Sequence, residues 1–187
     1  MHPRRLFAQL AIASALAALI VMAADTAPAR AQEIAPDTSA LQFLGFHAGD
    51  PLADVASRMQ VLGGSSLRCD RARRDRRVME CRGTVPDPVR GSNVKVWLSA
   101  IDSTAAVLTL SSDMGPDQLD GWRNALERAY GRVGAEVQGP QWMMQWVRQG
   151  RMMRLTWRVG GGERVASVSL VDGRVLDAWG RSRPQGG

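Results

Sequence analysis

Apolar residues between positions 41 and 113 repeat first with the spacing of a helix and then with the alternation of β-strands. After a short strand, "ALQFLGF", residues 52–62 carry the helical pattern. Pro51 suits the first helical turn, Asp50 is placed to cap it and Gly63 is placed to end it. The apolar face of this helix consists of Leu52, Val55, Ala56, Met59 and Leu62. Four stretches with strand-like alternation follow: "SLRCDR", "VMECRG", "VKVWLSAI" and "AAVLTLSS".

The same order of elements returns between residues 114 and 176. The stretch "GPDQLDGWRNALERAYG" predicts a helix that begins at Pro116 and ends before Gly131. The strand candidates "WMMQWVR", "MMRLTWRV" and "RVASVSLV" come next, with turns at Gln149–Gly150 and at residues 160–162. A two-residue turn at Gln149–Gly150 predicts three facing pairs, which are Trp146 with Met153, Met144 with Leu155 and Trp142 with Trp157.

Helices followed by runs of antiparallel strands, without β-α-β alternation, predict an α+β fold. We expect two α-β-β-β blocks in tandem, at residues 41–113 and 114–176, with their helices covering antiparallel sheet. Residues 32–40 and 177–187 are expected to be a flexible N-terminal segment and a flexible tail.

The N-terminus has the pattern of a secretory signal peptide. A cationic start with Arg4 and Arg5 precedes the apolar run from Leu6 to Ala24, and the small residues of "APARAQE" suit cleavage after Ala31. An uncleaved membrane anchor is the alternative, because the run is barely long enough to span a bilayer. Cleavage would leave no transmembrane helix, and we therefore expect a periplasmic or secreted protein with residues 1–31 removed.

The two cysteines of the chain, Cys69 and Cys81, are expected to form a disulfide. An exported protein meets an oxidising compartment, and the spacing matches neither a redox C-x-x-C motif nor a zinc pattern. Alternation places both sulfurs on the apolar side of adjacent strands.

The composition is that of a globular protein, with 45% apolar and 22% charged residues and a formal net charge of +6.

Two stretches, "FHAGDPLADV" and "LERAYGRV" with the tryptophan-bearing hairpin after it, resemble small exported α+β modules. These are the SmpA/OmlA-type outer-membrane assembly proteins and the tandem folds similar to β-lactamase-inhibitor protein. The resemblance implies a helix on an antiparallel sheet, used twice, in proteins that mostly bind other proteins. The chain lacks the lipobox cysteine of the SmpA/OmlA pattern.

Catalytic and metal-binding patterns are sparse, and we predict no catalytic residues, no metal site and no cofactor. His47 is the only histidine after the signal segment, so a Ser/His/Asp triad would have to use it. The doublets Met143–Met144 and Met152–Met153 could hold Cu(I), but alternation divides each doublet between the two sheet faces. Core filling is therefore the preferred interpretation of these methionines.

An arginine-rich stretch at the tip of the cysteine-bearing hairpin is the candidate binding site. Five arginines surround Asp75 within seven residues: Arg71, Arg73, Arg74, Arg76 and Arg77. We expect them to contact an acidic partner surface or an acidic envelope polymer, and the alternative is a solvated loop. Nucleic-acid recognition is not predicted, because no aromatic residues or reading helix interleave with the arginines.

The favoured function is a non-catalytic protein-binding or envelope-assembly module. The alternatives are an inhibitor of a secreted enzyme and a small periplasmic hydrolase.

Overall fold

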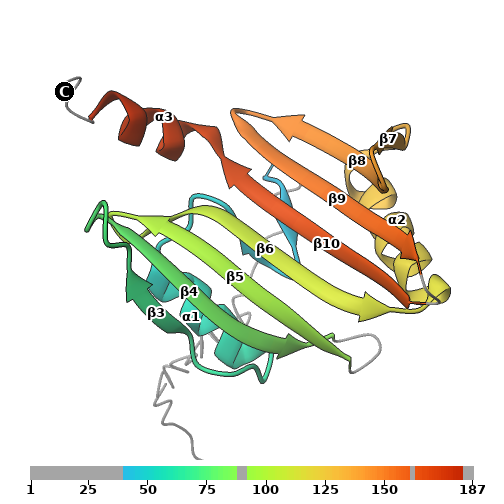
Figure 1. The fold of residues 1–187 in the computed structure, drawn as a ribbon, viewed down its shortest axis with the longest axis horizontal. Coiled ribbons are helices and arrows are strands. Elements are labelled where there is room, and N and C mark those ends of the chain that lie inside the picture. Colours follow the sequence, from blue (N-terminus) through green and yellow to red (C-terminus); the bar gives the residue numbers. More distant parts are fainter. Residues whose placement is uncertain (1–39, 88–91, 161–162, 183–187) are drawn as a thin grey trace, which may run out of the picture. The chain divides into compact units, whose positions relative to one another are not determined.

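The computed structural model describes residues 40–87, 92–160 and 163–182, and it has an α+β fold (Figure 1). Several predicted features lie outside the described residues. They are the expected signal peptide, residues 32–39, residues 161–162 of the predicted turn and residues 183–187. The three helices are α1 (Leu52–Val61), α2 (Pro116–Tyr130) and α3 (Gly173–Arg181). The strands are β1 (Gln42–Phe43), β2 (Phe46–His47), β3 (Arg68–Arg71), β4 (Val78–Pro86), β5 (Asn93–Ile101), β6 (Thr104–Met114), β7 (Glu136–Gln138), β8 (Gln141–Arg148), β9 (Arg151–Gly160) and β10 (Glu163–Asp172).

Eight strands form one antiparallel sheet in the order β3-β4-β5-β6-β10-β9-β8-β7 (Figure 1). Helix α1 precedes β3 to β6, which correspond to the four predicted strand candidates, and helix α2 precedes β7 to β10, one strand more than the three candidates predicted there. Each helix is therefore followed by four strands, one more than the expected α-β-β-β order. The two groups of strands join where β6 pairs with β10, for example at Leu108 opposite Leu170. Strand β7 was not predicted, because "EVQ" is too short to show a period of its own.

The hairpin formed by β8 and β9 has the register that the two-residue turn predicts. Gln149 and Gly150 both have positive φ angles, of 48° and 73°, as a tight hairpin turn requires. The facing pairs are Trp146 with Met153, Met144 with Leu155 and Trp142 with Trp157, as predicted. Because successive residues alternate between faces, these large side chains share one face of the sheet. Five of them are buried in the core, Met144, Trp146, Met153, Leu155 and Trp157, whereas Trp142 is 43% exposed.

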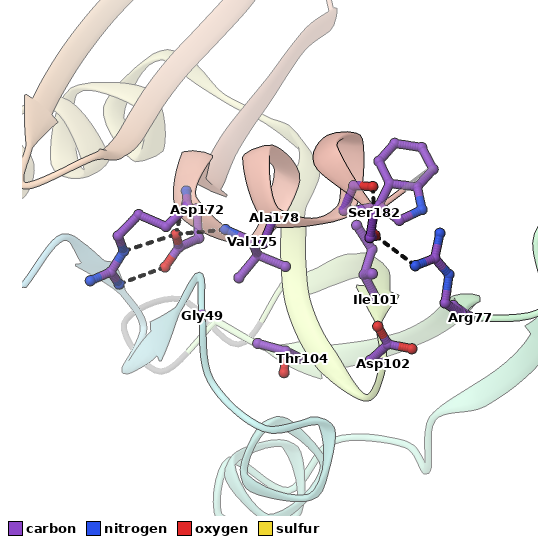
Figure 2. A pocket seen from close by; sticks show the side chains of 11 residues that line it. Gly49, Arg77, Ile101, Asp102, Thr104, Asp172, Val175, Ala178 and Ser182 are labelled. Atoms are coloured by element: carbon purple, nitrogen blue, oxygen red, sulfur yellow. Dashed lines mark hydrogen bonds and ion pairs between the residues drawn. The ribbon is translucent and has the colours of Figure 1, made fainter. Parts of the chain in front are cut away.

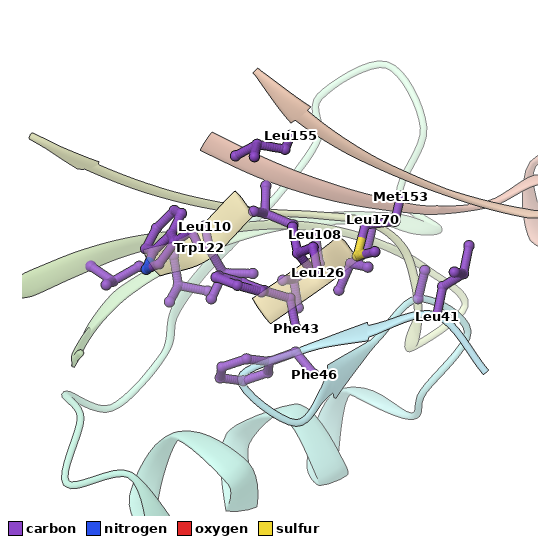
Figure 3. Packing of buried hydrophobic residues seen from close by; sticks show 14 of the residues in the cluster. Leu41, Phe43, Phe46, Leu108, Leu110, Trp122, Leu126, Met153, Leu155 and Leu170 are labelled. Atoms are coloured by element: carbon purple, nitrogen blue, oxygen red, sulfur yellow. The ribbon is translucent and has the colours of Figure 1, made fainter. Parts of the chain in front are cut away.

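The hydrophobic core lies between one face of the sheet, helices α1 and α2, and the β1–β2 hairpin. Figure 3 shows Leu108, Leu110, Met153, Leu155 and Leu170 directed from the strands toward Phe43 and Phe46. Trp122 and Leu126 of α2 enter the same cluster, and the Phe43 and Trp122 rings meet edge to face at 4.7 Å. The predicted division of the methionine doublets is also found, since Met144 and Met153 are buried while Met143 and Met152 are partly exposed.

Two details differ from the predicted helix ends. Pro51 occupies the N-cap position of α1, and no side chain caps that helix. Asp50, expected to be the cap, instead lies 3.1 Å from the His47 ring. Helix α2 begins at Pro116 and is followed by Gly131 with a φ of 92°, as predicted.

Helix α3 was not predicted and corrects the expected C-terminal boundary. We placed the end of the folded part at residue 176, whereas α3 continues to Arg181.

Among the residues that the structure describes, no helix is both long enough and apolar enough to span a bilayer.

Candidate functional site

The last residue of β3 and the loop that joins β3 to β4 are here called the arginine loop (residues 71–77). The expected disulfide holds this loop at its base. Cys69 and Cys81 face each other across the two strands with their Cα atoms 4.0 Å apart. Within the loop, the Val78 amide donates to the Asp75 carbonyl at 3.0 Å, and the Ala72 amide donates to the Val78 carbonyl at 2.9 Å. The backbone of the loop is therefore fixed by covalent and hydrogen-bonded constraints.

Asp75, the acidic residue of the loop, joins the loop to helix α3. Its carboxylate accepts hydrogen bonds from the Arg77 backbone amide at 3.0 Å and from Arg77 Nη2 at 3.1 Å. Trp179 Nε1 of α3 donates to the same carboxylate at 2.8 Å. The hydrogen bonds from Arg77, followed by the one from Trp179, hold the pKa of Asp75 well below its usual range. Asp75 is thus a charged anchor between segments 104 residues apart.

The five predicted arginines have different surroundings. Arg77 pairs with Asp75 and also donates from Nη1 to Ser182 Oγ at 2.7 Å. Arg71 Nη1 donates to the Arg76 carbonyl at 3.3 Å. The side chains of Arg73, Arg74 and Arg76 are exposed, and within the described ranges none of them reaches a carboxylate at ion-pair distance. Three guanidinium groups of the loop are therefore available to a partner.

A groove of about 670 Å³, here called the corner groove, lies between α3 and the turn that joins β5 to β6 (Figure 2). Its α3 wall carries Val175, Ala178 and Trp179, and the opposite wall carries Ile101 and Thr104. The remaining lining residues are Gly49, Arg77, Asp102, Asp172, Arg174 and Ser182. Arg77 belongs both to this groove and to the arginine loop, so the two features are continuous.

Asp172 closes the end of the groove away from the arginine loop. Its side chain is 1% exposed, accepts from Arg151 Nε at 2.9 Å and from Arg174 Nη2 at 2.8 Å, and also caps α3 by accepting from the Arg174 amide. Burial alone would raise the pKa of this carboxyl, but the hydrogen bonds from Arg174 and Arg151 outweigh burial and lower the pKa from 3.8 to about 2. Asp172 is therefore charged at neutral pH and fixes the start of α3.

Gly49 allows the segment before α1 to pass close to this buried carboxylate. Its φ is 92°, a conformation that side chains with a Cβ rarely adopt, and a Cβ there would collide with Asp172 Oδ2. The absence of a side chain at this position thus shapes one end of the corner groove.

The candidate catalytic histidine lies outside this corner. His47 Nδ1 is 3.1 Å from Asp50 Oδ2, with the two side chains 30% and 32% exposed. No set of three or more His, Cys, Asp or Glu side chains in the described part of the chain is arranged to hold a metal ion.

The sequence interpretation missed α3 and with it one whole wall of the groove. Two glycines and three charged residues within "GRVLDAWGR" obscure the helical pattern. The usable signals were Asp172 as an N-cap residue and the apolar spacing of Val175, Leu176 and Trp179.

Comparison with protein families, with characterised proteins and with solved structures found no match to this chain.

Proposed function

We propose that this chain is an exported, non-catalytic protein-binding module whose arginine loop contacts an acidic surface of its partner. One observation carries the proposal: Arg73, Arg74 and Arg76 are exposed on a loop whose conformation is fixed by a disulfide and by Asp75. Guanidinium groups suit planar, bidentate recognition of carboxylates. A backbone that is fixed before binding loses less conformational entropy when a partner binds. The fixed arginine loop therefore favours a binding role over the alternative of a solvated loop.

The arrangement of charge within the loop supports the same conclusion. Asp75 could have neutralised a neighbouring arginine at the surface, but its carboxylate is already occupied by Arg77 and Trp179. The loop therefore presents positive charge without a competing internal carboxylate. Such a field accelerates association with an acidic surface and weakens as salt is added.

Export is part of the proposal and is supported by two features. The pattern of residues 1–31 is that of a signal peptide, and a disulfide such as Cys69–Cys81 persists mainly in oxidising compartments. We place the protein in the periplasm or outside the cell on these grounds.

The proposed setting is envelope assembly, by resemblance to the SmpA/OmlA-type modules. The order of elements supports a unit used twice, because α1 is followed by β3 to β6 and α2 is followed by β7 to β10. In the resembling proteins a helix on an antiparallel sheet serves mostly to bind other proteins, and we propose the same use here.

The experiment measures binding of a fluorescein-labelled peptide of glutamate and serine by fluorescence anisotropy, at low and at high salt. Replacing the three exposed arginines together, as Arg73→Ser/Arg74→Ser/Arg76→Ser, is expected to weaken binding roughly tenfold, since exposed ion pairs contribute about 0.2–1 kcal/mol each. The melting temperature should change little, because none of the three side chains is buried.

A matched variant removes the same charge elsewhere. Arg128, Arg132 and Arg158 are also exposed, so Arg128→Ser/Arg132→Ser/Arg158→Ser is expected to leave most of the affinity intact. Equal loss in the two triple variants would mean that net charge, not the arginine loop, governs binding. If heparin binds more tightly than the peptide at equal charge, the partner of the arginine loop is an acidic polymer and not a protein.

A further inference from the structure

A second hollow of the protein, here called the edge pocket, lies beside β3. This strand is one edge of the large sheet and pairs with β4 (Figure 1). The pocket has a volume of about 570 Å³ and is bounded by the segment between α1 and β3, by β3 itself and by β4. Its lining residues are Ser65, Ser66, Arg68, Arg82, Gly83 and Thr84. The pocket therefore combines two arginines with three residues that carry hydroxyl groups.

The two arginines of the edge pocket stand directly opposite each other. Arg68 of β3 faces Arg82 of β4 in the antiparallel pairing, and like charges in such a pair destabilise a sheet. Arg82 lies 3.9 Å from Glu80, with side chains 73% and 47% exposed, so this ion pair contributes little. Arg68 makes no ion pair within the described part of the chain. A negatively charged ligand would relieve the repulsion between the two guanidinium groups.

The carboxylates nearest to these arginines lie on the side away from the edge pocket. Asp70 and Glu80 face each other two residues further along the strands, toward the arginine loop, whereas Thr84 lies on the opposite side of the arginines. Lys95, which faces Thr84 from β5, contacts Asp113 at 3.2 Å. Among the residues that the structure describes, those lining the edge pocket include two cations and no carboxylate.

Hydroxyl donors complete the edge pocket. The Ser65 amide donates to the Thr84 carbonyl at 2.8 Å, which fixes the segment after α1 against β4. Ser65 Oγ accepts from the Thr84 amide at 3.0 Å and from Thr84 Oγ1 at 3.4 Å, so its own hydroxyl proton is left to donate to a ligand. Ser66 is exposed and lines the same pocket. The pocket thus offers donors of two kinds, charged and neutral.

We propose that the edge pocket binds a phosphate monoester group. Such a group carries a charge between about −1.5 and −2 at pH 7 and has three terminal oxygens, so it can accept from both guanidinium groups and from a hydroxyl at once. A carboxylate has only two oxygens, and one bidentate guanidinium occupies both. This inference goes beyond the proposed function and does not rest on it, because Arg68 and Arg82 lie outside the arginine loop.

Titration of the isotope-labelled full chain with glycerol phosphate tests the proposal, with backbone amide resonances as the readout. The amide resonances of Ser65, Ser66 and Thr84 should shift and reach saturation. Acetate at the same ionic strength is expected to bind at least tenfold more weakly, because it engages only one of the two guanidinium groups.

The double variant Arg68→Ser/Arg82→Ser is expected to weaken binding of glycerol phosphate at least tenfold, since hydrogen bonds between charged groups are worth that much. It should fold, because both side chains are exposed and their mutual repulsion is removed. Glycerol phosphate should raise the melting temperature of the unmodified protein and leave that of this variant unchanged. Arg128→Ser/Arg132→Ser is the matched control, because it removes the same charge from exposed positions outside the pocket and should keep the affinity.

Three results would each overturn the proposal. They are the absence of a saturable shift at Ser65, Ser66 and Thr84, equal affinity for acetate and glycerol phosphate, and equal loss of affinity in the two double variants.

Vesicles of phosphatidylcholine and phosphatidic acid identify the source of the group, because phosphatidic acid carries the same monoester. Vesicle binding that is lost in Arg68→Ser/Arg82→Ser would support the proposal and assign the phosphate to a membrane lipid. Binding of glycerol phosphate without binding of vesicles would support it and assign the phosphate to a soluble molecule.

Discussion

Replacing Asp172 with asparagine should destabilise the protein in a pH-dependent way. The change keeps the size of the side chain and an oxygen that can cap α3, but it removes the negative charge that Arg151 and Arg174 contact at 2.9 and 2.8 Å. The perturbation therefore isolates the ion pairs of a carboxylate that is 1% exposed.

The magnitude follows from the lowered pKa. A carboxyl that titrates at 3.8 when unfolded and at about 2 when folded stabilises the folded state by about 2 kcal/mol above pH 4. Because the folded pKa is the lower one, this contribution is complete at neutral pH and is lost as the pH falls. About half of it remains near pH 3 and a few tenths of a kcal/mol remain near pH 2.

Urea denaturation followed by tryptophan fluorescence measures the effect. At pH 7, Asp172→Asn should lower the free energy of unfolding by about 2 kcal/mol and the melting temperature by about 5–8 °C. The difference between the two proteins should shrink as the pH is lowered, because the unmodified Asp172 then becomes neutral as well. Asp177→Asn, on an exposed residue of the same helix, should change stability by less than about 0.5 kcal/mol.

Two results would refute this reasoning. A loss of equal size at pH 7 and near pH 2 would show that shape, not charge, makes Asp172 important. A loss from Asp177→Asn as large as that from Asp172→Asn would show that α3 responds to any loss of negative charge.

Two further predictions concern stability. The double variant Cys69→Ala/Cys81→Ala should lower the free energy of unfolding by about 3 kcal/mol, which is the value expected for a loop closed across 12 residues. A urea midpoint equal to that of the oxidised protein would contradict this prediction. Asp87→Ala should cost about 2–3 kcal/mol in the same assay, because Asp87 is 2% exposed and accepts from Gln118 Nε2 at 3.0 Å and from Trp122 Nε1 at 3.2 Å. The substitution removes the acceptor of the buried Trp122 indole N–H and leaves Gln118 Nε2 with Ser92 Oγ at 2.6 Å. A loss below about 1 kcal/mol would show that water replaces the carboxylate.

Local pattern was sufficient for the parts of the fold that neighbouring residues determine. The disulfide followed from alternation, because Cys69 and Cys81 fall on the same face of paired strands. The register of the tryptophan hairpin followed from turn length, since a slip of one residue would have moved every large side chain to the other face.

The candidate site was predictable only in part. The density of arginine identified residues 71–77, but their unequal roles depend on contacts with a helix about a hundred residues away. Arg77 is occupied by Asp75 and Ser182, whereas Arg73, Arg74 and Arg76 remain exposed. Nothing in the spacing of the arginines distinguishes these two groups.

The sequence alone determined two helices, most of the strands, one hairpin register and the pairing of the cysteines, because each depends on periodicity or on a short turn. The joining of all eight strands into one sheet depends on β6 pairing with β10, and an alternating strand specifies which of its faces is buried but not which edge it joins. The groove likewise exists only where α3 meets the β5–β6 turn and Trp179 reaches Asp75. Those contacts join residues distant in sequence, so they were decided by the tertiary packing of the whole chain.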